Sequence, residues 1–70
     1  MVQRMDISVN GSVREIDVGS TVGQLIVGLG LNPAGVAVAV NKSVVPRSSR
    51  AAHMLEPDDR VEIIQAVGGG

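Results

Sequence analysis

The chain has 70 residues, with no cysteine, no aromatic residue and a formal net charge of -1. A chain of this length forms one small domain with a thin aliphatic core, which leaves no room for a deep, enclosed active site. The absence of cysteine excludes disulfides, thiolate chemistry and cysteine-ligated metals, and the near-neutral charge without aromatic side chains argues against nucleic acid as a partner.

The amino-terminal part of the chain predicts a β-hairpin. Residues 5–9 alternate apolar and polar side chains, and Asn10-Gly11 is a dipeptide typical of a two-residue hairpin turn. The return strand is expected over residues 12–18, where β-branched side chains alternate with charged ones, as on a strand with one face in water.

The apolar period then changes, which predicts a helix over residues 21–29. One helical face carries the apolar side chains that we expect to pack on the sheet: Val22, Leu25, Ile26 and Leu29. Thr21 and Gln24 have the spacing of a capping box at the helix start. Gly30 is expected to end the helix in the left-handed conformation.

The second half of the chain predicts three further strands. Residues 36–40 are an unbroken apolar run, expected to be a strand buried on both faces near the centre of the sheet. Residues 44–45 form a short strand that Pro46 ends, and residues 47–52 are read as a single helical turn. The last strand is expected over residues 60–67.

This order of elements predicts a single α+β domain over residues 1–70. A helix between two strand pairs indicates a crossover, and the usual right-handed connection places the first and last strands side by side in the middle of the sheet. We therefore expect a mixed sheet packed on one helix, with a folded core at residues 5–67 and an extended tail at residues 68–70.

The polar residues provide no catalytic group of side chains. His53 is the single histidine, has no carboxylate at an orienting spacing, and is interpreted as an ordinary surface or boundary residue. Three neighbouring carboxylates without the alternation of a calcium loop are interpreted as a solvated turn: Glu56, Asp58 and Asp59. Arg47 and Arg50 could pair with acidic groups of a partner, but the preferred interpretation is that they are solvated loop residues. No metal site is predicted.

The C-terminal tail is the segment whose composition points to chemistry. Three glycines, Gly68 to Gly70, follow the last strand, and without Cβ atoms they can thread a narrow cleft. We expect this tail to deliver the α-carboxylate of Gly70 into the active site of another protein. The alternative is a frayed chain end.

The last strand also predicts a surface for that partner. Period two sends Val61 and Ile63 to one face of the strand, and Ile64 and Ala66 to the other. If the first pair faces the helix, the second pair lies on the open face of the sheet beside the tail, as an apolar recognition patch. Edge packing within a thin domain is the alternative.

Six motifs of the chain, taken together, resemble those of the ThiS family, the small sulfur carriers of thiamine thiazole synthesis with the ubiquitin-like β-grasp fold. They lie at residues 9–11, 19–22 with Leu25, 36–41, 44–47, 59–63 and 69–70. Asn41-Lys42 stands where many members of that family have Asn-Gly, which leaves only the type of this turn open.

The resemblance implies a protein co-substrate and not an enzyme. The Gly70 carboxylate would be adenylated, converted to a thiocarboxylate, and used to donate sulfur for thiazole formation. The implied partners are a ThiF-like adenylating enzyme, a persulfide donor of a sulfur relay and a ThiG-like thiazole synthase. No cofactor is expected on this chain, since ATP and Mg²⁺ would belong to the adenylating enzyme. The residues expected to contact partners are Gly69, Gly68, Val67, Ala66 and Ile64.

Three other functions are compatible with this fold, although Gly69 and Gly70 argue against the third, because a binding module has no need of terminal glycines. One is a sulfur carrier of another pathway, such as the small subunit of molybdopterin synthase or a carrier in cysteine synthesis. Another is a ubiquitin-like protein modifier, and the third is a non-covalent β-grasp binding module. In each case the chain is expected to be a cytoplasmic protein, monomeric when free, that binds neither nucleic acid nor membrane.

Overall fold

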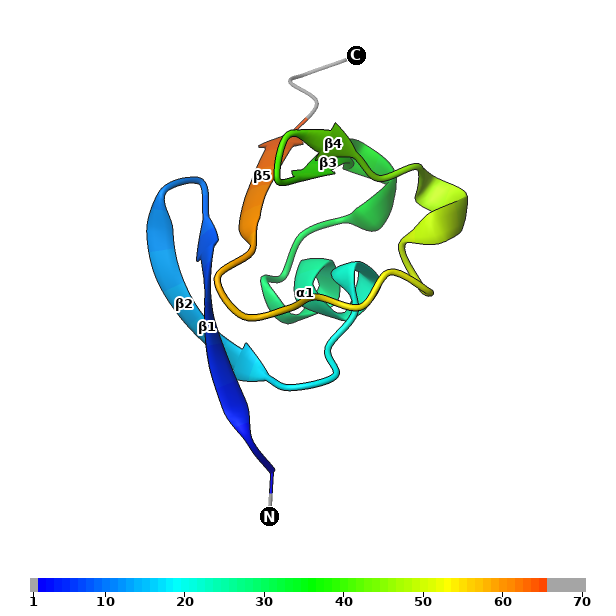
Figure 1. Cartoon of the computed structure of the whole chain (residues 1–70). Helices are drawn as coiled ribbons and strands as arrows, with labels where there is room; N and C mark the ends of the chain where they lie inside the picture. The colour runs from blue at the N-terminus through cyan, green and yellow to red at the C-terminus, as the bar shows by residue number, and fades with distance from the viewer. Residues whose placement is uncertain (1, 66–70) are drawn as a thin grey trace.

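The computed structural model describes residues 2–65, which form one mixed sheet, one α-helix and two short 3-10 helices (Figure 1). In chain order the elements are β1 (Arg4–Val9), β2 (Ser12–Asp17), α1 (Val22–Gly28), η1 (Pro33–Gly35), β3 (Val36–Val40), β4 (Ser43–Val44), η2 (Arg47–Ser49) and β5 (Arg60–Gln65). The predicted strand end at residues 66–67 and the predicted tail lie outside the described residues. Within residues 2–65, no helix is long and apolar enough to cross a membrane.

The strands lie in the order β2-β1-β5-β3-β4. β1 and β5 are parallel, whereas the other neighbouring strands are antiparallel. The predicted crossover is confirmed, because the first and last strands lie side by side in the middle of the sheet. The predicted fold class, a mixed sheet packed on one helix, is likewise confirmed.

Both hairpins turn through two residues with positive φ. Asn10 (φ 50°) and Gly11 (φ 86°) join β1 to β2, and Asn41 (φ 50°) and Lys42 (φ 72°) join β3 to β4. Positive φ at both central positions is the signature of a type I′ turn, whose twist fits the flanking strands. The second hairpin therefore has the geometry of the first, although a lysine stands where glycine is preferred.

Replacing Lys42 by glycine is expected to stabilise the domain by a net ~0.5 kcal/mol. A side chain in the left-handed region costs about 1 kcal/mol or more, and glycine removes this cost. Glycine also increases the entropy of the unfolded chain, which offsets part of the stabilisation. Thermal unfolding measures the difference. Ser43→Gly is the control, since residue 43 lies in β4 without a positive φ and should lose stability. Equal shifts in the two variants would contradict the strain at Lys42.

Helix α1 carries the predicted signals at both ends. At its start the backbone N–H of Gln24 donates to Thr21 Oγ1 (3.2 Å), and the backbone N–H of Thr21 donates to Gln24 Oε1 (2.9 Å). The capping box is confirmed. After the helix, Gly30 adopts φ 76° and its N–H donates to the Val27 carbonyl (3.0 Å), which closes the last turn. The helix itself is one residue shorter at each end than predicted, because the end positions are caps.

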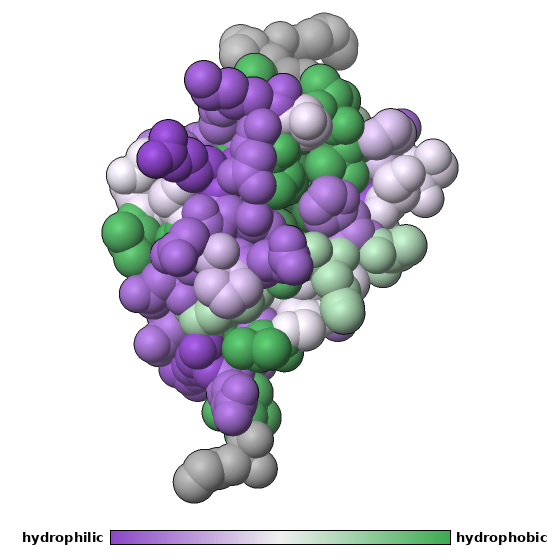
Figure 2. Space-filling view, in the orientation of Figure 1, coloured by the Kyte–Doolittle hydropathy of each residue, from purple (hydrophilic) through white to green (hydrophobic). Residues whose placement is uncertain are grey.

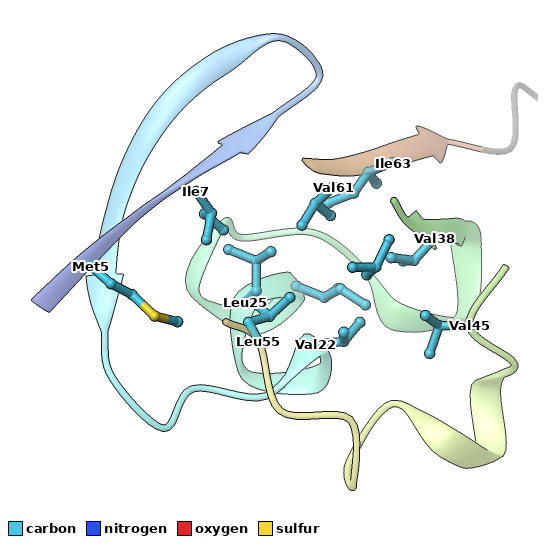
Figure 3. Close-up of a cluster of buried hydrophobic side chains, with 11 residues drawn as sticks. Met5, Ile7, Val22, Leu25, Val38, Val45, Leu55, Val61 and Ile63 are labelled. Atoms are coloured by element: carbon cyan, nitrogen blue, oxygen red, sulfur yellow. The ribbon is translucent and has the colours of Figure 1, made fainter. Parts of the chain in front are cut away.

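The hydrophobic core lies between α1 and one face of the sheet (Figure 3). It consists of the buried side chains of Met5, Ile7, Val22, Leu25, Ile26, Val38, Val40, Val45, Leu55, Val61 and Ile63. Three of the four residues predicted on the helix face are fully part of it, while Leu29 at the cap is half-buried. Within residues 2–65 the one α-helix covers this face, and we call the other side of the sheet the open face.

The prediction that residues 36–40 are buried on both faces is wrong. Val38 and Val40 belong to the core, but Ala37 is exposed and Ala39 is only half-buried, because they lie on the open face. Alanine continues an apolar run in the sequence but is often exposed in folded proteins. The sequence pattern therefore overstated the burial of this strand. The short strand is shifted by one residue from the prediction and spans Ser43–Val44. The Val45 N–H still donates to the Val38 carbonyl (2.9 Å), and the Val45 side chain lies in the core.

The interpretation of Arg50 as a solvated loop residue is also wrong, whereas Arg47 is exposed as expected. Arg50 is buried, with Nη1 donating to the Pro33 carbonyl (2.9 Å) and Nη2 to the Val36 carbonyl (2.6 Å). Its own carbonyl accepts from the N–H of Gly23 (3.1 Å). Because a guanidinium has five donors on an apolar stem, it can bind several carbonyls in a dry place. Arg50 thereby joins the segment after β4 to α1 and to the start of β3.

Candidate functional site

The strand that leads to the predicted tail is the centre of the sheet. β5 lies between β1 and β3, and it ends at the top of the molecule in Figure 1, opposite the start of β1. β5 is paired on both sides at Arg60 and Val61, and with β3 alone as far as Gln65. Of the predicted site residues, Ile64 is described by the structure. The others lie outside the described residues: Ala66, Val67, Gly68, Gly69 and Gly70.

The two faces of β5 differ as predicted. Val61 and Ile63 are 1% and 8% exposed and belong to the core, whereas Ile64 is 70% exposed. The period of two places the first pair under α1 and Ile64 on the open face. An isoleucine this exposed, one residue from the end of a central strand, stands apart from the buried isoleucines at positions 7 and 26.

Ile64 is part of a larger apolar surface. Residues directly opposite each other on antiparallel strands point to the same face, and Ala37 lies opposite Ile64 while Val44 lies opposite Ala39. Val44 is 76% exposed. We call Ala37, Ala39, Val44 and Ile64 the open-face patch. Figure 2 shows hydrophobic side chains gathered over β3 and β4, beside the end of β5.

Charged side chains border the open-face patch. Arg60 and Glu62 precede Ile64 on the same face of β5, and Lys42 lies in the neighbouring turn, where these residues line a shallow groove. In the described part of the chain, ion pairs join only Arg4 to Glu15 (3.3 Å) and Asp17 (3.5 Å), both exposed. Lys42 and Arg60 are therefore available to acidic groups of a partner, a role that sequence reasoning considered only for Arg47 and Arg50.

The start of β5 is held by Asn41 and Asp59. The Asn41 backbone N–H donates to the Arg60 carbonyl (2.7 Å), and Asn41 Oδ1 accepts from the Arg60 N–H (2.9 Å). Asn41 Nδ2 also donates to Asp59 Oδ1 (2.9 Å), while Asp59 Oδ2 accepts from the Glu56 N–H (2.8 Å). Asp59 is thus buried and fully engaged, so its interpretation as part of a solvated turn is wrong. Glu56 and Asp58 are exposed, as expected.

The end of β5 is held by Asn10. Its backbone N–H donates to the Val61 carbonyl (2.9 Å). Its side chain then binds both polar groups of one residue, since Oδ1 accepts from the Ile63 N–H (2.8 Å) and Nδ2 donates to the Ile63 carbonyl (3.1 Å). Sequence analysis used Asn10 and Asn41 only as turn residues. Each asparagine is the first residue of a two-residue turn that lies next to β5. This shared position was the available signal that their side chains bind β5.

The remaining polar candidates keep structural roles. His53 is half-buried, and its carbonyl accepts from the N–H of Val22 at the start of α1 (2.9 Å), as fits a boundary residue. Among residues 2–65 there is no group of three or more histidine, aspartate or glutamate side chains that could hold a metal ion. The notable features of the described surface are therefore the exposed open-face patch and the side-chain hydrogen bonds that hold β5.

Comparison with known proteins places these features in one family. The model of the ThiS family matches residues 7–70. The chain is 33% identical over 66 residues to the sulfur carrier protein ThiS of Escherichia coli strain K12, covering 94% of this chain and 100% of that protein. It is 41% identical over 66 residues to a thiazole synthase of Magnetococcus marinus, of which it spans only 20%. A thiazole synthase of Paramagnetospirillum magneticum is 36% identical over 66 residues, and the chain again spans 20% of it.

Solved structures agree with the sequence comparison. The crystal structure of the thiamine biosynthesis protein ThiS from Geobacter metallireducens superposes with a TM-score of 0.81 at 29% identity, covering 94% of this chain and 100% of that one. A solution NMR structure of a thiamine biosynthesis protein from the same organism gives a TM-score of 0.75 at 30% identity, covering 94% and 88%.

Proposed function

Because the chain belongs to the ThiS family, we propose that it carries sulfur for thiamine biosynthesis as a thiocarboxylate on Gly70. The family predicted from the sequence motifs is confirmed. The observation that carries the proposal is that the match to the family continues through residue 70 and so includes the terminal glycines. The same similarity extends over the whole length of a protein named as a sulfur carrier.

The chemistry follows from the poor reactivity of a carboxylate. An ionised carboxylate is a weak electrophile, so a ThiF-like partner would attach AMP from ATP and release pyrophosphate, leaving a mixed anhydride on Gly70. A persulfide of the sulfur relay displaces AMP and forms an acyl disulfide. A second thiol then attacks the sulfur of the donor, leaves as a disulfide with it, and releases the Gly70 thiocarboxylate. In this scheme ATP and Mg²⁺ bind the adenylating enzyme and none of the catalytic groups comes from this chain.

Thiazole synthase is the proposed acceptor of the sulfur. Two relatives of the chain bear that name, and the chain resembles about a fifth of each. A carrier domain present in the same polypeptide as its acceptor has a high effective concentration there, which favours transfer between the two. This observation favours the thiamine pathway over transfer to molybdopterin or to cysteine synthesis. The cytoplasmic location of this chain and its monomeric state when free remain predictions.

We assign the docking of these partners to the open-face patch. Its apolar side chains lie on the face that α1 does not cover, and Ile64 is one residue from the end of β5, the strand that leads to Gly70. A fully desolvated apolar centre with a polar rim is the usual anatomy of a protein interface. Arg60, Glu62 and Lys42 provide that rim.

Ile64→Asp is expected to raise the KM of the carrier in the adenylation reaction by about tenfold or more, because a carboxylate would be buried against the partner. The melting temperature should change little, since Ile64 is 70% exposed. The measurement is ATP–pyrophosphate exchange with the cognate adenylating enzyme at increasing carrier concentration.

Val13→Asp is the matched control for this variant. Val13 is 76% exposed and lies opposite Ser8, on the open face but at the far edge of the sheet. It should leave KM unchanged. Equal effects of the two substitutions, or unfolding caused by Ile64→Asp, would contradict the open-face patch as the docking site.

The experiment that tests the proposed function as a whole uses the unaltered chain. With the adenylating enzyme and ATP it should support pyrophosphate exchange, and with a persulfide donor and a thiol its intact mass should show one oxygen replaced by sulfur. Exchange followed by attachment to lysine side chains would identify a protein modifier instead. The absence of any pyrophosphate exchange would indicate a non-covalent binding module.

A further inference from the structure

The carboxamide of Asn10 takes the place of a peptide group in the sheet. The backbone N–H of Asn10 donates to the Val61 carbonyl, as the parallel pairing of β1 with β5 requires. The next bond of a parallel ladder would run from the Ile63 N–H to the carbonyl of residue 10. With φ at 50°, however, the chain turns away into β2 at this residue. Oδ1 accepts that N–H instead, at 2.8 Å.

The amide nitrogen of Asn10 completes the substitution. In a continuing strand, a backbone N–H two residues further would donate to the Ile63 carbonyl. Here Nδ2 donates to it at 3.1 Å. The side chain thus supplies one acceptor and one donor, both to the same residue of β5, and extends the central ladder beyond the last residue of β1.

The Asn10 side chain makes the last described hydrogen bonds to β5 on the side of β1. On the β3 side, pairing continues through Ile64 opposite Ala37 and Gln65 opposite Val36. On the β1 side, Asn10 is the last partner of β5 among residues 2–65. Asn10 also lines a groove on each face of the sheet, with Glu62 in one and Leu29 in the other. Water would reach the Ile63 peptide groups from both grooves if the carboxamide were removed.

We propose that Asn10 is a positioning residue for the reaction at the C-terminus, an inference that rests on the proposed function. It holds the backbone of Ile63 on the side of β5 where no strand continues, two residues before the end of the strand. A reacting group carried a few residues further then searches a smaller volume when the carrier docks. Asn10 contacts neither ATP nor the reacting carboxylate, and it acts through β5.

The test compares Asn10→Gly with Asn41→Gly. Both asparagines have φ 50° and begin equivalent turns, so glycine fits both backbones and each variant removes only a carboxamide. Asn41 holds Arg60 at the start of β5, whereas Asn10 holds Ile63 near its end. Comparison of the two variants therefore distinguishes a general destabilisation of β5 from the loss of hydrogen bonds near its C-terminal end.

In Asn10→Gly, hydrogen exchange at the Ile63 amide should become about tenfold faster or more, with Arg60 unaffected, and Asn41→Gly should give the reverse. In ATP–pyrophosphate exchange, Asn10→Gly should lower kcat about tenfold at unchanged KM, because the open-face patch is intact while the carboxylate is misplaced. Asn41→Gly should change neither constant. Asn10→Asp keeps the acceptor and loses the donor, so its kcat should lie between those of the wild-type chain and the glycine variant.

A normal kcat in Asn10→Gly would overturn the positioning role, and so would an equal loss of kcat in Asn41→Gly. Unchanged exchange of the Ile63 amide in Asn10→Gly would overturn the contact itself. If Asn10→Gly does not fold, Asn10→Asp provides the same comparison. A wild-type chain that supports no pyrophosphate exchange would instead remove the proposed function, and the role of Asn10 in that reaction with it.

Discussion

Deleting Gly69 and Gly70 is expected to abolish adenylation while leaving the melting temperature almost unchanged. Glycines have no side chain to bury, so their loss removes little apolar area from the fold. The new terminal carboxylate, on Gly68, would fall short of the phosphates of ATP by about 7 Å, the length of two extended residues. Misplacement by even ~1 Å at a reacting centre is costly, so no residual exchange is expected. ATP–pyrophosphate exchange and thermal unfolding measure the two effects.

Adding a single glycine after Gly70 is the opposite change and tests the same assignment. The longer chain still ends in a glycine carboxylate, but that group lies about 3.5 Å further along, and the Gly70 carboxyl becomes an amide that cannot be adenylated. It should also fail in the exchange assay. Normal exchange by either variant would refute the assignment of the reaction to the Gly70 carboxylate.

Leu25→Ala is expected to destabilise the domain by about 2–5 kcal/mol. Leu25 is 6% exposed and lies in the core between α1 and the sheet, so its truncation leaves a cavity. A domain of this kind has a total stability of only about 5–15 kcal/mol, and the loss is a large part of it. Denaturant and thermal unfolding measure it directly.

Val27→Ala provides the comparison on the same helix. Val27 is 67% exposed, and alanine has the higher helix propensity, so stability should stay within about 0.5 kcal/mol of the wild-type value. A Leu25→Ala variant with an unchanged melting temperature, or a Val27→Ala variant as unstable as Leu25→Ala, would contradict the core assigned to α1.

The parts of the fold that follow from local rules could be read from the sequence. Thr21 and Gln24 are three residues apart and bind each other's backbone, so their capping box needs no knowledge of the rest of the chain. The same holds for the Asn10-Gly11 turn and for the alternation along β5. The order of these elements also predicts that the first and last strands lie side by side, because the usual crossover is right-handed.

The parts that depend on contacts between distant segments could not be read in this way. Arg50 is buried because η1 and β3 present two carbonyl groups to it, and nothing in its neighbouring residues indicates their approach. Asp59 is buried because Asn41 lies beside it across the sheet. In both cases a charged side chain in a polar stretch looks like a solvent-exposed one until its partners are placed.

In the candidate site, too, local patterns could be read from the sequence and contacts between distant segments could not. The exposed position of Ile64 followed from the period of two, but its apolar neighbours did not. Ala37 belongs to a segment predicted to be buried and Val44 to a short strand of unknown orientation. Only the register of β3 against β4 and β5 brings them to the side of Ile64. The two contacts of the Asn10 side chain were equally inaccessible, since they join residues at opposite ends of the chain.

The parallel pairing of β1 with β5 has a consequence for how the protein is made. Ser8 pairs with Arg60, so the ribosome must release the chain as far as β5 before the middle of the sheet can close. Such distant pairing is slow compared with formation of a hairpin, and until then β1 and β3 each lack their central neighbour. The open-face patch is incomplete during this time, because Ile64 arrives with the last strand. A partner that recognises the open-face patch would therefore bind the domain only after β5 has taken its place between β1 and β3.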